Sequence, residues 1–465
     1  MVVGLFGAFG VPACVLSDGN PILAGGDTAE PEDVIERSDD AGADRDGHAD
    51  DRGADDARED FGADGDGDGD GDADGGCTPV LSAAFNVVLT AADGEERPVA
   101  LRSMIGFVFF GRPPAPIAAD GLRFQRLDLE GAATVMPVWT LSSVELGPQH
   151  PLLELPDGTF ATAFTVTSGV QPGIWMKVFP SRGTGGEVPY QVPGTDENSS
   201  TPTITFDGVD VVAAWMHYIG GTVEIRAQHV SASTGVAMGS AVTVASGPTG
   251  TKEPRIAWGD FRHALTYFSA SDGALHVLSL DGSLAAMRED VLTPAADESF
   301  VGYPALAWGG TQFGLAWETR SVSTSTIHLA TFMADGTPVE HTPLEGIVPL
   351  TASDGGRVGL AFGDVGNEWG LAWRRAETGR VGISLVRIDA SDFHIKDGPI
   401  DMRSETTSGW NPSVAYNNGY YMVTWVEQPG AGFPIYEATY GCTPQRLAPR
   451  PRPDRGRVRD RTTCP

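Results

Sequence analysis

The sequence has few cysteines, few basic residues and no long apolar run. Its 465 residues include four cysteines, and 31 lysines and arginines stand against 62 aspartates and glutamates, for a formal net charge of −31. Phosphate binding requires clustered lysine and arginine, so this balance excludes nucleic acid as a partner. The apolar N-terminal stretch MVVGLFGAFGVPAC has fourteen residues, too few to cross a bilayer as a helix.

Motifs of the common catalytic and metal sites are also missing. The chain has no HExxH, CxxC, GxSxG, Walker loop or Rossmann glycine motif, and its nine histidines are not set at ligand spacings. The recurring Asp-Gly pairs occupy hairpin positions, where turn chemistry explains them. We therefore predict no catalytic residue, no metal site and no cofactor.

Glycine, proline and tryptophan are abundant, and they follow a repeat. The chain has 60 glycines, 33 prolines and 10 tryptophans, which favours many short strands joined by tight turns. In each repeat a short apolar run, a turn and a second apolar run end on an aromatic residue. Seven such aromatic residues are spaced by 50 to 56 positions: Phe110, Phe164, Trp215, Tyr267, Trp317, Trp373 and Trp425.

A period near 50 residues with four short strands per unit is typical of a β-propeller blade. From Ala83 to Gly441 the chain resembles β-propeller proteins. We predict an all-β fold, a seven-bladed β-propeller of four-stranded antiparallel blades, because each blade must cover its faces by stacking on its neighbours. The repeated aromatic residues should then pack in the core between blades rather than stack on sugars.

The two ends of the repeat region predict how the ring closes. The last repeat has three strands before Gly441, and residues 85–98 (FNVVLTAADGEERP) align with the fourth strand of a repeat. We predict that this N-terminal segment completes the last blade. Cys77 and Cys442, both in GCTP sequences, then fall in one turn, and we predict a disulfide between them, which requires an oxidising compartment. The alternative is a coincidental repeat with reduced cysteines.

Segments outside the repeats have biased compositions. Residues 27–74 hold 21 acidic residues and four arginines, so we predict a disordered acidic linker over 27–76; specific calcium binding is the alternative. VPAC resembles a bacterial lipobox that would lipidate Cys14 and make residues 1–26 a signal segment. Plain secretion or an intracellular protein are the alternatives, since a basic n-region is missing. The propeller should span 77–445, before a disordered Arg/Pro-rich tail over 446–465.

One face of the propeller is the expected binding face, because it carries the loops between second and third strands and between blades. The candidate binding residues there are His150, His217, Glu253, Glu318, Arg357, Arg374, Trp410 and Glu427. We predict a monomeric, non-enzymatic binding or scaffolding module, secreted or on the bacterial envelope, for a protein or glycan ligand. Membrane contact would come only through a lipid anchor. The alternative is a carbohydrate-active enzyme, a glycoside hydrolase or lyase, with its site at the mouth of the propeller channel. A glycosidase there needs two carboxylates about 5 to 9 Å apart.

Overall fold

The structure is a computed structural model, and the chain divides into two compact units, Met1–Gly71 and Asp72–Pro465. All described residues belong to the second unit. They are residues 79–81, 85–88, 99–103, 106–111, 123–127, 151–167, 171–179, 189–322, 324–344, 357–377, 380–402, 409–427 and 435–441. Within these ranges there is no helix, and hence none that is long and apolar enough to cross a membrane.

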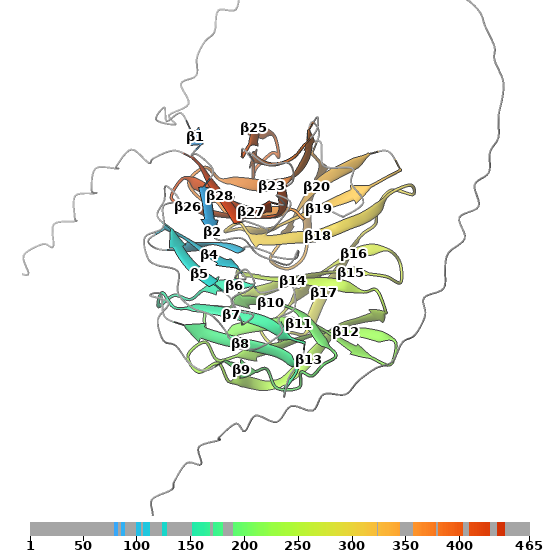
Figure 1. Cartoon of the computed structure of the whole chain (residues 1–465). Helices are drawn as coiled ribbons and strands as arrows, with labels where there is room; N and C mark the ends of the chain where they lie inside the picture. The colour runs from blue at the N-terminus through green and yellow to red at the C-terminus, as the bar shows by residue number, and fades with distance from the viewer. Residues whose placement is uncertain are drawn as a thin grey trace, which may run out of the picture. The chain divides into compact units, whose positions relative to one another are not determined.

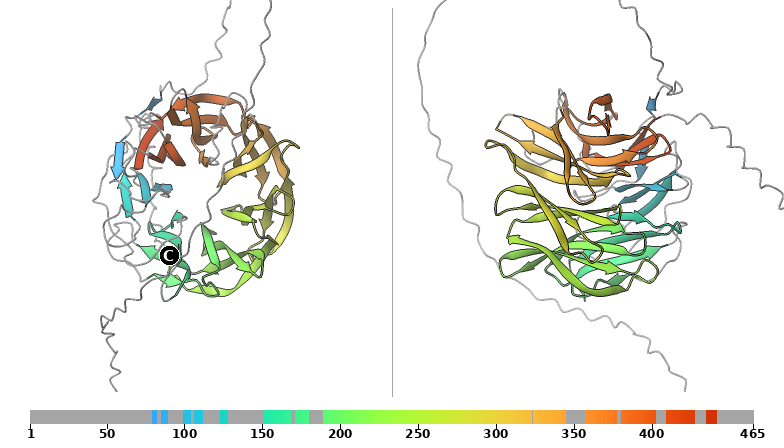
Figure 2. Two further views of the ribbon diagram at one scale, coloured as in Figure 1. Left: turned by 45° about the vertical axis from the view of Figure 1, so that its right-hand side comes forward. Right: turned by 180° about the vertical axis from the view of Figure 1, so that it is seen from behind.

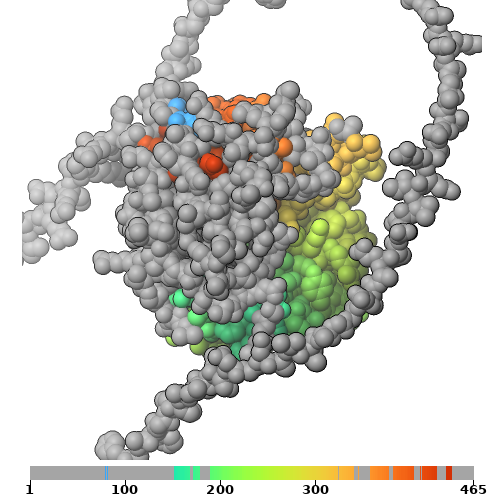
Figure 3. All heavy atoms as spheres, in the orientation of Figure 1, coloured from blue at the N-terminus to red at the C-terminus, as the bar shows by residue number. Residues whose placement is uncertain are grey.

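The second unit is a seven-bladed β-propeller, as the repeat predicts. Seven antiparallel sheets follow one another around a ring in chain order, as the left view of Figure 2 shows. In the space-filling view, the three blades from β10 to β21 adjoin one another from green to yellow (Figure 3). The first blade contains three strands among the described residues, the last contains five, and the other five blades contain four each.

Most of the strands are labelled in Figure 1. The first three blades contain β3 (Val99–Ser103), β4 (Gly106–Gly111) and β5 (Arg123–Leu127); β6 (Leu152–Glu154), β7 (Phe160–Val166), β8 (Gly173–Phe179) and β9 (Tyr190–Gln191); and β10 (Ser199–Phe206), β11 (Val211–Ile219), β12 (Thr222–Val230) and β13 (Ala237–Pro248). The fourth and fifth contain β14 (Lys252–Gly259), β15 (Arg262–Ser269), β16 (Ala274–Leu280) and β17 (Ala286–Leu292); and β18 (Ser299–Trp308), β19 (Gln312–Arg320), β20 (Ser325–Met333) and β21 (Pro338–Pro343). The last two contain β22 (Gly359–Gly363), β23 (Glu368–Glu377), β24 (Arg380–Asp389) and β25 (Ile395–Asp401); and β26 (Gly409–Asn417), β27 (Tyr420–Glu427) and β28 (Ile435–Gly441), joined by β1 (Val80–Leu81) and β2 (Phe85–Val88).

The N-terminal segment closes the ring, which confirms the predicted strand exchange. Both β1 and β2 pair antiparallel with β28, with Val80 opposite Gly441 and Phe85 opposite Glu437. Backbone hydrogen bonds therefore join the two ends of the propeller across the last blade. Cys77 and Cys442 lie outside the described residues, and their disulfide stays a prediction.

The repeated aromatic residues form the core between blades. The six with described side chains, from Phe164 to Trp425, are at most 5% exposed. Each lies on the second strand of its blade, and the five from Trp215 to Trp425 pack against the preceding blade; Trp425, for example, shares a cluster with Ile383 and Leu385 of β24. Core packing is thus confirmed over exposed sugar-stacking platforms. The side chain of Phe110 lies outside the described residues.

Glycines at two equivalent positions admit a ring from the next blade. A Cβ atom at Gly314 of β19 would lie 2.6 Å from the Trp369 indole, and one at Gly370 of β23 would lie 2.1 Å from the Tyr421 ring. Carbon atoms do not approach this closely, so a side chain at either glycine would displace the neighbouring blade. These glycines set the spacing at which successive blades stack.

Four inner strands are interrupted at a proline. The register shifts span Pro202 in β10, Pro254 in β14, Pro304 in β18 and Pro412 in β26. Proline has no N–H for the ladder, so a bulge accommodates it. The residue before the proline has a left-handed backbone in three cases, with φ of 51° at Thr201, 64° at Glu253 and 49° at Asn411. Each bulge therefore reorients the side chains at the start of its inner strand.

Candidate functional site

The predicted binding residues lie at one end of the blades, which we call the rim. There the inner strands begin and the second strands end: Ser199 pairs with His217, Val301 with Glu318 and Gly409 with Glu427. Trp410 and Glu427 lie at this end of β26 and β27, but their side chains are outside the described set. His150 lies wholly outside it.

Side chains from three successive blades meet at the rim in what we call the arginine–tyrosine cluster, made of Glu253, Arg255, Tyr303 and Arg357. The Arg357 guanidinium carbon lies 4.0 Å from the centre of the Tyr303 ring, and that of Arg255 lies 5.8 Å from the same centre. A carboxylate oxygen of Glu253 lies 3.8 Å from an Arg255 nitrogen. One ring is thus flanked by two guanidinium groups, a cation–π arrangement.

Backbone geometry holds this cluster in place. Tyr303 and Arg357 form an isolated parallel bridge between the start of one inner strand and the segment leading into the next. Glu253 has a left-handed backbone conformation within its bulge. Its carboxylate faces the guanidinium of Arg255, two residues later in β14. Two of the predicted residues, Glu253 and Arg357, are therefore brought together through two that the sequence analysis missed, Arg255 and Tyr303.

The other predicted rim residues form local contacts. His217 Nδ1 lies 3.0 Å from the Ser199 hydroxyl on the paired strand. The carboxylate of Glu318 lies 3.6 Å from Arg320, another residue that the sequence analysis missed. Arg374 is buried, and its Nε donates a hydrogen bond to the Gly409 carbonyl of the next blade, at 3.0 Å.

Few acidic side chains lie on the inner strands of the third to seventh blades. Among β10, β14, β18, β22 and β26, the only carboxylate side chain is that of Glu253. Glu253 is 6% exposed and Glu318 is 3% exposed, and each faces an arginine. The arginine–tyrosine cluster therefore brings two guanidinium groups close together, and paired N–H donors of this kind suit a carboxylate or sulfate ligand.

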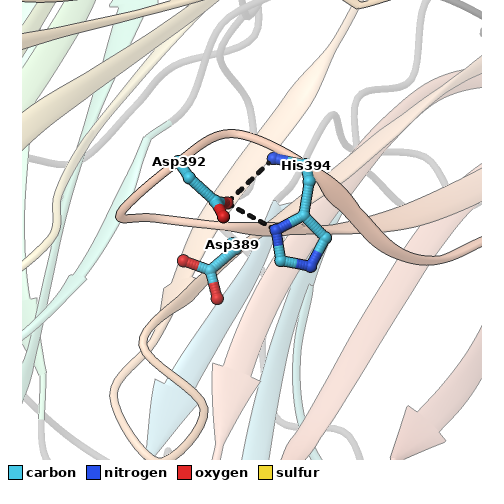
Figure 4. Close-up of side chains that lie close together, drawn as sticks. All are labelled: Asp389, Asp392 and His394. Carbon is cyan, nitrogen blue, oxygen red and sulfur yellow. Dashed lines mark hydrogen bonds and ion pairs between the residues drawn. The ribbon is translucent and has the colours of Figure 1, made fainter.

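A second group of titratable side chains lies away from the rim, in the turn between β24 and β25. Asp389, Asp392 and His394 place one ligand atom each within 4.8 Å of one another (Figure 4). The Lys396 ammonium lies 2.8 Å from Asp389. Burial raises the pKa of Asp389, but the hydrogen bonds from Lys396 and Ser391 outweigh it and hold this pKa well below its usual range. The Asp389 carboxylate is thus already paired with Lys396.

The chain matches no protein-family model and no curated protein. Among solved structures, an ulvan lyase bound to -[GlcA(1-4)Rha3S]- superposes with a TM-score of 0.50 at 8% identity, over 76% of this chain and 95% of its own. The β-propeller domain of the trilobed protease from Pyrococcus furiosus superposes with a TM-score of 0.42 at 11% identity, over 74% and 95%. At such identities the likeness shows the fold alone: this is a β-propeller protein.

Proposed function

We propose that this protein is a non-enzymatic binding module whose rim holds an acidic glycan. The observation that carries the proposal is the arginine–tyrosine cluster, in which two guanidinium groups from different blades converge on Tyr303. Positive charge is scarce in a chain with a net charge of −31. The convergence of two guanidinium groups on one ring therefore favours a ligand with carboxylate or sulfate groups.

The burial of two rim carboxylates, Glu253 and Glu318, favours binding over glycosidic hydrolysis. A hydrolase needs one carboxyl group to protonate the leaving oxygen and a second one across the bond, both reaching the substrate. Glu253 and Glu318 are both nearly buried, and each is shielded by an arginine on its own strand. Such pairs neutralise a carboxylate and hold it back from a sugar ring.

Acidic glycans are the first ligands to test because of the fold. The ulvan lyase with a similar fold was solved with a saccharide that carries glucuronate and rhamnose 3-sulfate. A β-propeller is thus able to present a surface to a chain of that charge, although the residues of the two proteins differ almost everywhere. Catalysis on such a chain remains the rival function and is an outcome of the experiment below.

We further propose that the module works outside the cytoplasm, on the bacterial envelope or secreted, as a monomer. Three sequence features support this placement: VPAC at Cys14, the acidic segment after it, and the pair Cys77 and Cys442. An acidic segment with few apolar residues, following a lipidated cysteine in the sequence, would hold the propeller away from the membrane surface.

A glycan array probed with the full chain tests this function. The array carries uronate, sulfated and neutral glycans together with acidic peptides. We expect binding to the acidic glycans that weakens with salt and falls about tenfold in Arg357→Ala, the loss of one charge-assisted contact. Arg262→Ala is the matched control, because it removes the same charge at the opposite end of a blade, where Arg262 pairs with Gly259 in a hairpin.

Two results would contradict the proposal. Preference for acidic peptides or neutral glycans would show that the ligand class is wrong. New reducing ends, or the ultraviolet absorbance of an unsaturated uronate, would show that the protein is an enzyme.

A further inference from the structure

A groove of about 510 Å³ lies between two neighbouring blades, and no residue of the arginine–tyrosine cluster lines it. One wall is the outermost strand β13 of the third blade, and the other is made by β15, β16 and β17 of the fourth (Figure 1). Its polar lining includes Ser246, Tyr267, Ser269, His276, Arg288 and Glu289. The volume lies in the range of small-molecule sites.

The groove coincides with a departure from the repeat. The inter-blade aromatic residue is tryptophan in the third, fifth, sixth and seventh blades and tyrosine in the fourth, at Tyr267. Tyr267 still packs in the core between the third and fourth blades. A phenol is smaller than an indole, and it brings a hydroxyl where the other four blades have carbon or a ring N–H. At this position the fourth blade thus has a smaller side chain than those four blades, and that side chain carries a hydroxyl group.

That hydroxyl belongs to a network of four side chains. The Tyr267 hydroxyl donates to Glu289 Oε1 at 3.3 Å, and the same oxygen lies 2.6 Å from His276 Nδ1. His276 Nε2 lies 2.9 Å from Asp272 Oδ2. The rings of Tyr267 and His276 stack, with centres 5.0 Å apart and planes 21° from parallel. Burial and the neighbouring Glu289 raise the pKa of Tyr267, so its phenol stays protonated.

The two carboxylates of the network are oriented by the protein and remain open to solvent. The Asp272 side chain is 45% exposed and that of Glu289 is 47% exposed, while His276 between them is 12% exposed. Fixed, half-exposed oxygens beside serine hydroxyls are suitable acceptors and donors for hydroxyl groups. A fixed network also lowers the entropy lost when a ligand is held.

Hydrogen-bonding groups and charges of both signs surround the groove. Both ring nitrogens of His276 face a carboxylate, and Arg288 lines the groove beside Glu289. A surface that mixes both signs with hydroxyl groups selects neither an anion nor a cation strongly. The groove therefore suits a neutral ligand rich in hydroxyl groups.

From this geometry we infer that the groove is a second binding site, specific for a neutral mono- or disaccharide. The site is independent of the acidic-glycan function proposed for the rim, since it shares no residue with it. His276 and Glu289 would hold sugar hydroxyls, Asp272 would orient His276, and the serines of β13 and β15 would form the sides.

The test is saturation-transfer NMR on the full chain with maltose, cellobiose and lactose as probes, at millimolar concentration. Methyl glucuronide and lysine methyl ester are the anionic and cationic comparison probes. We expect at least one neutral disaccharide to bind. Ser246→Trp, a change at an exposed position that fills the groove, should abolish this binding. Glu289→Gln should weaken it about tenfold.

Asp290→Asn is the matched control for Glu289→Gln. It removes one charge from the next residue of β17, whose side chain points to the other face of the sheet, and it should bind as the unmodified chain does. Arg357→Ala at the rim should also bind normally, which separates this site from the proposed function. Melting temperatures confirm that each variant is folded. The inference is overturned if no neutral disaccharide binds, if only a charged probe binds, or if Ser246→Trp binds as well as the unmodified chain.

Discussion

The guanidinium of Arg357 lies 4.0 Å from the centre of the Tyr303 ring, while the backbones of the same two residues form a parallel bridge. The two residues come from successive blades, so the contact joins the blades as well as placing a cation at the rim. A residue pair that does both should contribute to stability even without a ligand.

A double-mutant cycle on this pair measures that contribution. We expect a coupling free energy of about 1 kcal/mol between Arg357→Ala and Tyr303→Ala, the scale of a partly buried cation–π contact. Urea unfolding of the two single variants and the double variant gives the value. If the losses of stability in the two single variants add up to the loss in the double variant, the contact between Arg357 and Tyr303 contributes nothing to stability.

The tryptophans between blades should be far more sensitive. Trp215 is fully buried between the second and third blades, in a cluster with Ala161 and Ile174. Trp215→Ala should lower the free energy of unfolding by about 3 to 5 kcal/mol, because a large cavity remains between sheets that cannot close on it. Val322→Ala, at a fully exposed residue, is the control and should change stability by less than about 0.5 kcal/mol. A small loss in Trp215→Ala would argue against a rigid inter-blade core.

The spacing between blades is testable at a glycine. Gly314→Ala should destabilise the protein by about 1 to 3 kcal/mol, because its new methyl group meets the Trp369 ring. Gly282→Ala serves as the control, since a Cβ atom there meets nothing within 4 Å and its φ is not left-handed. Thermal unfolding of both variants distinguishes steric conflict from the general effect of replacing glycine. Equal melting temperatures would contradict the close approach.

Acid should destabilise the propeller through a buried histidine at the end opposite the rim. Burial lowers the pKa of His263 to about 4, against the opposing effect of the Asp207 carboxylate. The unfolded chain takes up this proton near pH 6.5 and the folded one only near 4. The stability from His263 is therefore complete above about pH 6.5 and lost as the pH falls towards 4, by about 3 kcal/mol.

Urea unfolding at neutral pH and near pH 4 measures this loss. In His263→Gln the stability should fall less between the two pH values than in the unmodified chain. The control is His394→Gln, at an exposed histidine, which should keep the full dependence. The same slope in all three proteins would exclude His263 as the titrating group.

The repeat made the fold predictable, while the site depended on features that the repeat does not carry. Aromatic residues such as Trp215 and Trp425 recur at a fixed spacing, and the closing segment around Phe85 matches a missing strand, so both could be inferred from local patterns. Tyr303 becomes a rim residue only because the bulge at Pro304 and the stacking of blades place it beside Arg357. Contacts between blades have no fixed separation in sequence.

The seam of the ring leads to the last prediction. Val80 pairs with Gly441, so the described chain on each side of the seam reaches within three residues of Cys77 and one residue of Cys442. We expect a disulfide between these cysteines, which would stabilise the protein by about 5 kcal/mol because it closes a very long loop. Mass spectrometry of peptides from a non-reducing digest should recover them linked, and reduction should lower the melting temperature. Cys77→Ser should lower it as much as reduction does and make it insensitive to further reductant. Free thiols at both positions in protein isolated from its native compartment would leave β1 and β2 holding the ring by hydrogen bonds and packing alone.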